Sequence, residues 1–241
     1  MLTNVSIVFI AVPALIALVN LLLPVILRKL LAFAGALFLL VLTGYTYFSE
    51  SLQSGSGLWT LYGTRIFTMD QMSLFALAFI QLLALIILVY SLFGVKQDIQ
   101  KPFYVLFSLS VAACNGVVLS DHGISFLIFW GLSGMTLFLF ALLGHSDQAL
   151  QSAKKTLLII GGSDAVLIMG LAVMALIKPE AQWSISQYHI PVFGGTAWLA
   201  FILVLIAALA KAGGFPLHTW LPDYARDVSV EGAALLPASL D

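Results

Sequence analysis

Charged side chains are scarce in this sequence, and their scarcity excludes most soluble folds. Only 9% of the 241 residues are Asp, Glu, Lys or Arg, whereas 61% are hydrophobic. An average soluble domain carries roughly 25% charged residues. The mean hydropathy of +1.08 points the same way. A chain of this composition is expected to be an integral membrane protein.

Cysteine and clustered basic residues are missing as well. The one cysteine, Cys114, cannot form an internal disulfide or a cysteine-rich metal site, and a small core residue is the simpler interpretation. A net charge of -1 with scattered basic residues gives no surface for nucleic acid. The sequence has no glycine-rich nucleotide loop, no G-x-S-x-G and no C-x-x-C. No cofactor is therefore expected in this chain, which is not expected to be redox-active itself.

Long apolar runs are what the sequence has in abundance. A helix needs about 20 apolar residues to cross a bilayer, and seven runs approach or reach that length, with an eighth beginning near residue 230. The sequence therefore predicts an all-α, polytopic transmembrane bundle of about seven to eight helices. A polar stretch at 50–65 allows a short hairpin outside the membrane. The seven runs are 5–27, 30–48, 72–93, 103–119, 124–143, 156–177 and 196–210.

The basic residues are distributed unevenly between the loops. Most of them follow the first, third, fifth and seventh runs, and only Arg65 and Lys178 lie in the alternate loops. Basic residues favour the cytoplasmic side of a membrane, so the N-terminus is expected to face outward. The first run has no preceding basic residue and no small-residue cleavage site, which favours a retained helix over a signal peptide.

The most informative segment is residues 211–223, which read KAGGFPLHTWLPD. Lys211 ends an uncharged run, and the two glycines and the proline that follow interrupt a helix. Such a lysine is either an anchor that reaches the membrane surface or part of an ion path, because charges inside membranes often mark one. Backbone groups freed by the interruption need protein or water around them. We therefore expect the seventh helix to be broken between residues 210 and 216.

The same segment resembles the K-[SA]-x-x-[FL]-P-L-H-x-W-L-P-D signature of the antiporter-like subunits of respiratory complex I, Mrp-type sodium/proton antiporters and membrane-bound hydrogenases. Weaker similarity extends back to about Met69. The resemblance implies an N-terminal three-helix segment at 1–101 and a first inverted repeat at 102–241, incomplete at its C-terminal end. Family members carry a second repeat that completes the ion path. We expect that part to come from a separate chain or another subunit, unless the chain is a truncated relic kept as a scaffold.

Two charged residues of the family pattern are absent. In the family, a glutamate that follows a tryptophan on the fifth helix pairs with the lysine matched by Lys211, but residues 130–132 read WGL and 124–143 holds no acid. The sixth helix of the family has R-x-G-D, whereas residues 161–164 read GGSD. Asp164 is then either part of a hydrogen-bonded kink or the counter-charge for Lys211, because a buried lysine needs a partner for its charge.

Two further residues match positions that the family uses. Anchoring alone explains Lys155 at the start of the sixth helix, and an ion entrance is the alternative that the resemblance suggests. His218 in the broken segment is a proton relay or a donor to free backbone groups. A metal is not expected there, because no second His or Cys lies nearby. Asp223 is expected to cap the next helix or to pair with Arg226.

These features lead to one main hypothesis and two alternatives. We expect an antiporter-like membrane subunit of a redox-driven proton or sodium pump, similar to NADH–quinone oxidoreductase or a membrane-bound hydrogenase, in a bacterial or archaeal cell membrane. Its ion path would use Lys211, Asp164, His218 and Lys155. Its partners would be other membrane-arm subunits and the lipid bilayer. The alternatives are a scaffold that conducts no ions, since two family charges are absent, and an independent membrane enzyme that uses His218 and Asp223.

Overall fold

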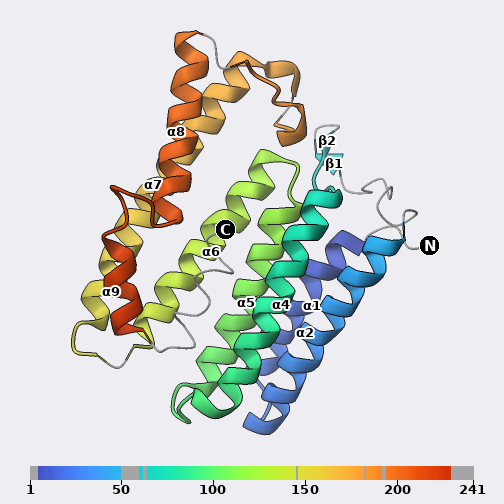
Figure 1. The fold of residues 1–241 in the computed structure, drawn as a ribbon, viewed down its shortest axis with the longest axis vertical. Helices are drawn as coiled ribbons and strands as arrows, with labels where there is room; N and C mark the ends of the chain where they lie inside the picture. Colours follow the sequence, from blue (N-terminus) through green and yellow to red (C-terminus); the bar gives the residue numbers. More distant parts are fainter. Residues whose placement is uncertain are drawn as a thin grey trace.

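Helices make up nearly all the regular structure in the computed structural model, which describes residues 5–49, 60–61, 64–144, 146–181, 183–191 and 194–228 (Figure 1). Two short strands and two 3-10 turns accompany the helices in this part of the chain. The strands are β1 (Thr60–Leu61) and β2 (Thr64–Arg65), and the turns are η1 (Pro179–Ala181) and η2 (Ile185–Gln187). The α-helices are α1 (Val5–Asn20), α2 (Val25–Phe48), α4 (Gln71–Gly94), α5 (Gln100–Leu119), α6 (Gly123–Leu142), α7 (Ala149–Ile177), α8 (Gly195–Lys211) and α9 (Trp220–Asp227).

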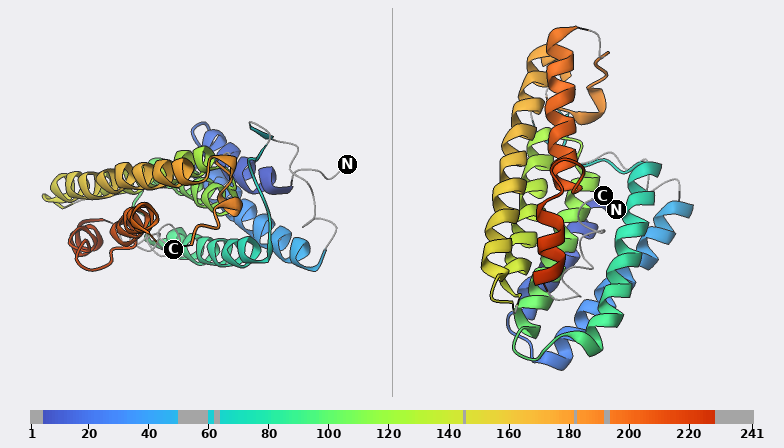
Figure 2. Two further views of the ribbon diagram at one scale, coloured as in Figure 1. Left: turned by 90° about the horizontal axis from the view of Figure 1, so that it is seen from above. Right: turned by 60° about the vertical axis from the view of Figure 1, so that its left-hand side comes forward.

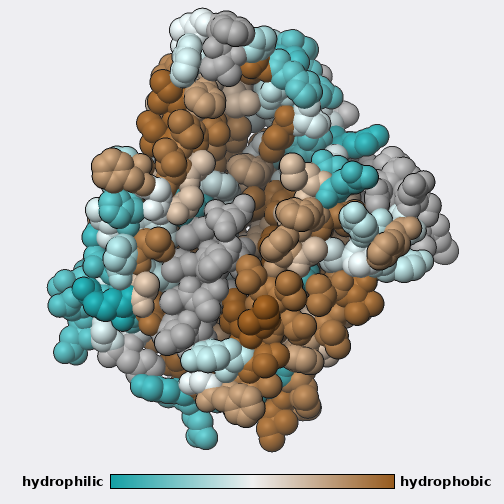
Figure 3. Space-filling view, in the orientation of Figure 1, coloured by the Kyte–Doolittle hydropathy of each residue, from teal (hydrophilic) through white to brown (hydrophobic). Residues whose placement is uncertain are grey.

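Five of the described helices, α2, α4, α5, α6 and α7, are long and apolar enough to cross a membrane. The helices α1 and α8 are also apolar but shorter, at 16 and 17 residues. Apolar side chains cover wide areas of the face seen in Figure 3, and polar ones gather toward its ends. The predicted all-α transmembrane bundle is therefore confirmed. The predicted eighth run near residue 230 lies outside the described residues, and the division at residue 101 stays a prediction.

The helices pack as a chain of neighbours. Helix α1 packs on α5, α2 on α4, α5 on α6, α6 on α7, and α7 on α8. In Figure 1, α1, α2, α4 and α5 form one side of the molecule and α7 with α8 the other, with α6 between them. The largest core cluster includes Phe103, Phe140 and Trp220, each at most 1% exposed. This cluster joins the two sides of the molecule, because its members come from helices on both.

A proline inside α1 creates the contact that fixes this helix to its neighbours. Pro13 has no N–H, so the carbonyl of Phe9, four residues earlier, lacks its usual helical donor. The Asn115 amide of α5 donates to that carbonyl at 2.7 Å, and the Gln81 amide of α4 donates to the Asn115 side chain at 2.8 Å. Both amide side chains are fully buried. The polar groups that the proline leaves free are thus used to join three helices.

One end of the molecule is closed by polar loop contacts. Strands β1 and β2 pair antiparallel, with Thr60 opposite Arg65, and confirm the predicted hairpin. The backbone N–H of Asp121 donates to the Ile66 carbonyl at 2.9 Å. The Asp121 carboxylate accepts from the backbone N–H of Ser186 at 2.8 Å. These bonds hold the ends of α4, α5 and α7 together.

The predicted helix break is confirmed, and it is longer than expected. Helix α8, which corresponds to the seventh apolar run, ends at Lys211, and α9 starts only at Trp220. Gly213 has a φ of 65°, a conformation that other residues rarely adopt. The Trp220 indole N–H donates to the Ala210 carbonyl at 2.9 Å, so it satisfies one of the acceptors at the end of α8. Figure 2 shows α8 and α9 following one another along α7.

Candidate functional site

Lys211 lies inside the protein at the last residue of α8. Its side chain is only 2% exposed. The ammonium donates to the backbone carbonyl of Trp130 at 2.7 Å and to the hydroxyl of Ser133, both on α6. The same nitrogen lies 4.0 Å from the centroid of the Trp130 ring, a cation–π contact. The charge of Lys211 is therefore held by neutral groups of α6.

Asp164 lies near Lys211 but is not bonded to it. In the described part of the chain no direct ion pair joins the two residues. The Asp164 carboxylate instead accepts a hydrogen bond from the indole N–H of Trp130 at 2.7 Å. One indole thus contacts both members of the predicted pair. Trp130 thus lies between Lys211 and Asp164, and the role of Asp164 as counter-charge stays a prediction.

The glycines around this site differ in what surrounds them. A Cβ at Gly131 or Gly161, the two positions where the family has charges, would meet no atom within 4 Å. A Cβ at Gly134 would lie 2.9 Å from Ile160 and 3.7 Å from Asp164. Gly134 therefore allows α6 and α7 to approach closely, and that approach brings Asp164 to Trp130. Among the described residues, no other side chain has filled the space at Gly131 or Gly161.

Lys155 is part of a second polar cluster, which runs along α9 from its N-cap to its last residue. Its ammonium donates to the Asp223 carboxylate at 2.7 Å and to the Thr219 carbonyl at 2.6 Å. Arg226 also lies 3.6 Å from Asp223. The predicted pairing of Asp223 with Arg226 is confirmed, whereas capping is wrong, because Thr219 occupies the N-cap position and Asp223 lies in the first turn. Lys155 thus connects the start of α7 to α9.

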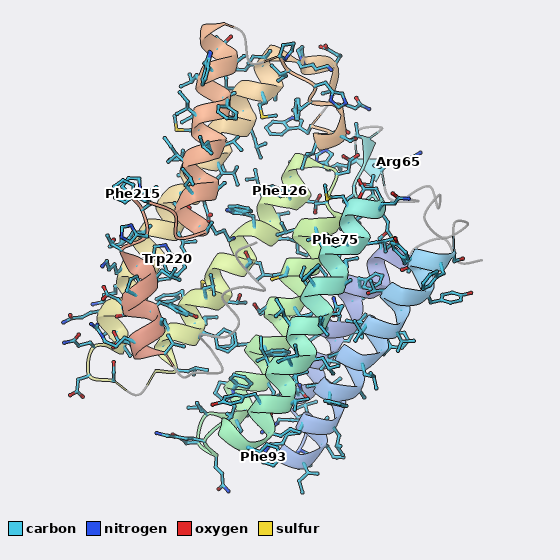
Figure 4. The ribbon with its side chains drawn as sticks, viewed as in Figure 1. Arg65, Phe75, Phe93, Phe126, Phe215 and Trp220 are labelled. Atoms are coloured by element: carbon cyan, nitrogen blue, oxygen red, sulfur yellow. The ribbon has the colours of Figure 1, made fainter. Side chains whose placement is uncertain are left out.

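His218 lies in the interrupted segment, apart from the other predicted residues. Its ring centroid is 5.8 Å from that of Phe215, and its Nδ1 atom is buried without a hydrogen-bond partner. Among the described residues, no hydrogen bond joins His218 to Lys211 or Asp164. Phe215 is 83% exposed and Trp220 fully buried; in Figure 4 their labels mark the interrupted segment and the start of α9.

Asp227 completes the cluster around α9. Its carboxylate accepts hydrogen bonds from the hydroxyls of Ser152 and Ser146, the latter at 3.0 Å, and pairs with Arg226 at 2.9 Å. Arg226, and after it the hydroxyl of Ser152, hold the pKa of the Asp227 carboxyl well below its usual range. Asp227 therefore fastens the end of α9 to the loop before α7 and to the first turn of α7.

Sequence reasoning missed Trp130, Ser133 and Asp227 as members of these two clusters. Trp130 and Ser133 are three residues apart, so they lie on one face of a helix. The hydroxyl of Ser133 within the apolar run 124–143 was the signal that could have indicated a polar contact there. The contacts of Asp227 with serines gave no local signal, because Ser152 and Ser146 lie 75 and 81 residues away in the sequence. In the described part of the chain, no group of three or more His, Cys, Asp or Glu residues could hold a metal ion.

The fold and the site together define a class of protein. Apolar helices, one of them interrupted, carry a buried lysine at the interruption and an acid nearby. This arrangement is typical of membrane proteins that handle ions or charged substrates at a broken helix. Residues 120–240 match the family described as "NADH:quinone oxidoreductase/Mrp antiporter, TM", and the chain belongs to this family. The resemblance seen in the sequence is therefore confirmed, and the matched residues include the whole Lys211 site.

Similar proteins come from related membrane complexes. A Na(+)/H(+) antiporter subunit of Alkalihalophilus pseudofirmus is 29% identical over 167 residues, which cover 64% of this chain and 20% of that protein. A chain of the Mrp complex from a Dietzia species shares the fold with a TM-score of 0.80 at 21% identity, covering 96% of this chain and 45% of that one. A chain of respiratory complex I from Thermus thermophilus gives 0.80 at 18%, covering 100% and 50%. This chain thus spans a fifth of the curated relative and about half of each structural neighbour.

Proposed function

We propose that this chain is an antiporter-like subunit that contributes part of an ion-translocation half-channel to a multi-subunit, redox-driven proton or sodium pump. The observation that carries the proposal is Lys211, a buried ammonium at a helix break that shares one tryptophan with a nearby acid. Charges buried inside a membrane bundle mark ion paths more often than they stabilise a fold. A lysine suits this role because its ammonium binds and releases a proton and its stem is flexible.

The second cluster supplies a way to couple events at the membrane surface to Lys211. Breaking the Lys155–Asp223 contact would loosen the start of α9 on α7, while Asp227 would still hold its end. Helix α9 begins with Trp220, whose indole bonds the Ala210 carbonyl next to Lys211. A shift of α9 would therefore disturb the last turn of α8, where Lys211 lies. In this proposal Lys155 acts at the entrance, and His218 relays protons within the interrupted segment that connects the two helices.

The similar proteins suggest two possible driving forces for ion transport. The curated relative belongs to a Na(+)/H(+) antiporter, whereas one structural neighbour comes from respiratory complex I. The proposal that electron transfer drives the complex rests on the wider family resemblance. Everted membrane vesicles separate the possibilities. Ion uptake that requires an electron donor supports a redox-driven pump, and exchange in response to an imposed proton gradient alone supports an Mrp-type antiporter.

Neighbouring subunits are proposed from the surface of the bundle. Asp164 is only partly buried, although it lies within a membrane-spanning helix. Phe215 projects from non-helical backbone, which hydrocarbon does not tolerate. We infer that other membrane-arm subunits cover these exposed residues in a bacterial or archaeal cell membrane. The remaining surface would face the lipid bilayer.

A scaffold without ion conduction is the second candidate. The space at Gly131 and Gly161 favours it, because both family charges are absent and nothing among the described residues has replaced them there. A scaffold would need Lys211 and Asp164 only for packing. The two candidates therefore differ in what happens when these side chains lose their charge.

The test is ion uptake by vesicles that contain the assembled complex with Lys211→Ala or Asp164→Asn. Lys211→Ala removes both hydrogen bonds of the ammonium and its charge, so we expect uptake to fall by roughly tenfold or more. Asp164→Asn should act in the same direction while keeping an acceptor for the Trp130 N–H. Lys178→Ala, in a loop, is the matched control. If both site variants assemble and transport at the parent rate, the chain is a scaffold.

A further inference from the structure

The contacts that Lys211 makes on α6 indicate that residues other than Lys211 and Asp164 take part in the proposed ion path. The ammonium has three contacts there: the Trp130 carbonyl, the Trp130 ring face and the Ser133 hydroxyl. None of the three carries a charge. We propose that Trp130 and Ser133 form a neutral ammonium site that takes over the position of the acid absent at residue 131, and that Lys211 alternates between this site and Asp164 during transport. The proposal rests on the proposed ion-translocating function.

The Ser133 hydroxyl is oriented to accept. Its own proton is donated to the Trp130 carbonyl at 2.8 Å, so the lone pairs of its oxygen are available to the Lys211 ammonium. Ser133 is only 1% exposed. Thr136, one turn further along α6, donates to the Ser133 carbonyl at 2.8 Å. The bond of the Ser133 hydroxyl to the Trp130 carbonyl does not involve Lys211, so the hydroxyl can keep its orientation when the ammonium leaves.

Trp130 keeps the ammonium and the carboxylate on different parts of one side chain. The ring face contacts Lys211, and the N–H at the ring edge contacts Asp164. A carboxylate at residue 131 would add Coulomb attraction to the hydrogen bonds of the ammonium, so its release from α6 would be slower. Neutral dipoles and an aromatic ring face bind an ammonium with a less favourable free energy than a carboxylate does. The neutral site therefore releases the ammonium more readily than a carboxylate at residue 131 would.

The surroundings of Gly131 support the proposal that Trp130 and Ser133 bind the ammonium in place of the absent acid. A side chain at Gly131 would point into open space, whereas Trp130 and Ser133 face Lys211. The ammonium therefore does not depend on position 131 in this protein. Trp130 and Ser133 are positioning residues in the proposed path, since they act through Lys211.

The test uses four variants of the assembled complex in vesicles. Ser133→Ala removes one acceptor, and we expect ion uptake to fall by about tenfold, with normal assembly. Ser133→Thr keeps the hydroxyl and should restore uptake to near the parent rate. Ser163→Ala is the matched control, because Ser163 is also buried but donates only to the Ile160 carbonyl of its own helix. In a Lys211→Ala background, Ser133→Ala should change nothing further, because its effect passes through the lysine.

The outcomes separate this inference from the proposed function. Uptake at the parent rate in Ser133→Ala, together with loss of uptake in Lys211→Ala, would reject the neutral site and leave the function standing. Uptake at the parent rate in the single variant Lys211→Ala would reject both the neutral site and the proposed ion-translocating function. If Ser133→Ala does not assemble, Trp130→Phe and Trp130→Leu decide instead. The phenylalanine keeps a ring face for the ammonium and should transport several-fold faster than leucine; equal rates would count against the site.

Discussion

Single hydroxyl residues show how this chain tolerates polar atoms inside membrane helices. Most of them donate to a carbonyl three or four residues earlier in the same helix, as Thr43, Ser108 and Thr156 do. Such a bond satisfies the donor without a partner from another helix. Ser133 follows this rule too, and Lys211 then uses the lone pairs that the rule leaves over. A common helix device thereby provides an acceptor for an ammonium.

His122 makes stability depend on pH. It is fully buried at the N-cap of α6, where its Nδ1 atom accepts from the N–H of Ile124 at 3.2 Å. Burial lowers the pKa of His122 from 6.5, although nearby Asp121 opposes the shift. Because the unfolded chain binds the proton more readily, this contribution to stability is complete above pH 6.5 and is lost as the pH falls through the folded-state pKa.

We therefore expect the thermal stability of the complex to fall as the pH drops below about 6.5. His122→Asn should keep an N-cap acceptor and remove the titrating group, so its stability should change less over the same range. His189→Asn, at an exposed loop residue, is the control and should behave like the parent. Parallel curves for the parent and His122→Asn would contradict this assignment.

At the scale of elements, the break between α8 and α9 depends on Gly213. Its positive φ disfavours other residues, and a Cβ there would lie 2.9 Å from Leu221. We expect Gly213→Ala to destabilise the folded protein by about 1–2 kcal/mol, because both the backbone and the contact become unfavourable. Gly162→Ala is the control in open helix surface and should be neutral or slightly stabilising. Thermal unfolding in detergent measures both, and equal midpoints would show that the break does not need this glycine.

The elements also show what sequence reasoning can reach. The helix break was predictable, because glycine and proline act on their own backbone. The Trp130–Asp164 contact was not, since it depends on how far α6 rotates and on the close approach that Gly134 permits. The contacts of Asp227 were equally out of reach, because the chain must fold back through α7 before Ser152 and Asp227 meet. The sequence therefore predicts the membrane spans, the helix break and the charged residues near it. It does not predict which groups Lys211 and Asp164 contact.

At the scale of the whole molecule, the loops separate into two polar ends. At one end Lys29 donates to the Leu92 carbonyl, and Arg226 bonds the Gln148 side chain. At the other end Asp121 bonds Ser186, and Lys178 donates to the Gln187 carbonyl. Alternate loops therefore gather at opposite ends, as a bundle of spanning helices requires.

The end that holds most basic residues is predicted to face the cytoplasm. In a Cys114→Ala background, Gln151→Cys should react with a membrane-impermeant thiol reagent only in everted vesicles. Gln187→Cys, exposed at the opposite end, should react in intact cells. Both positions serve as controls for each other. Labelling of Gln151→Cys from outside intact cells would reverse the orientation and place the N-terminus in the cytoplasm.

The position of Trp130 has an optical consequence. The absorption and emission of an indole shift with the electric field across its ring, and this ring has a cation at its face and an acid at its N–H edge. Any movement of Lys211 or change in the charge of Asp164 alters that field. Trp130 would therefore act as a fluorescent reporter of the proposed exchange of Lys211, which could be followed in real time once the other four tryptophans are replaced by phenylalanine.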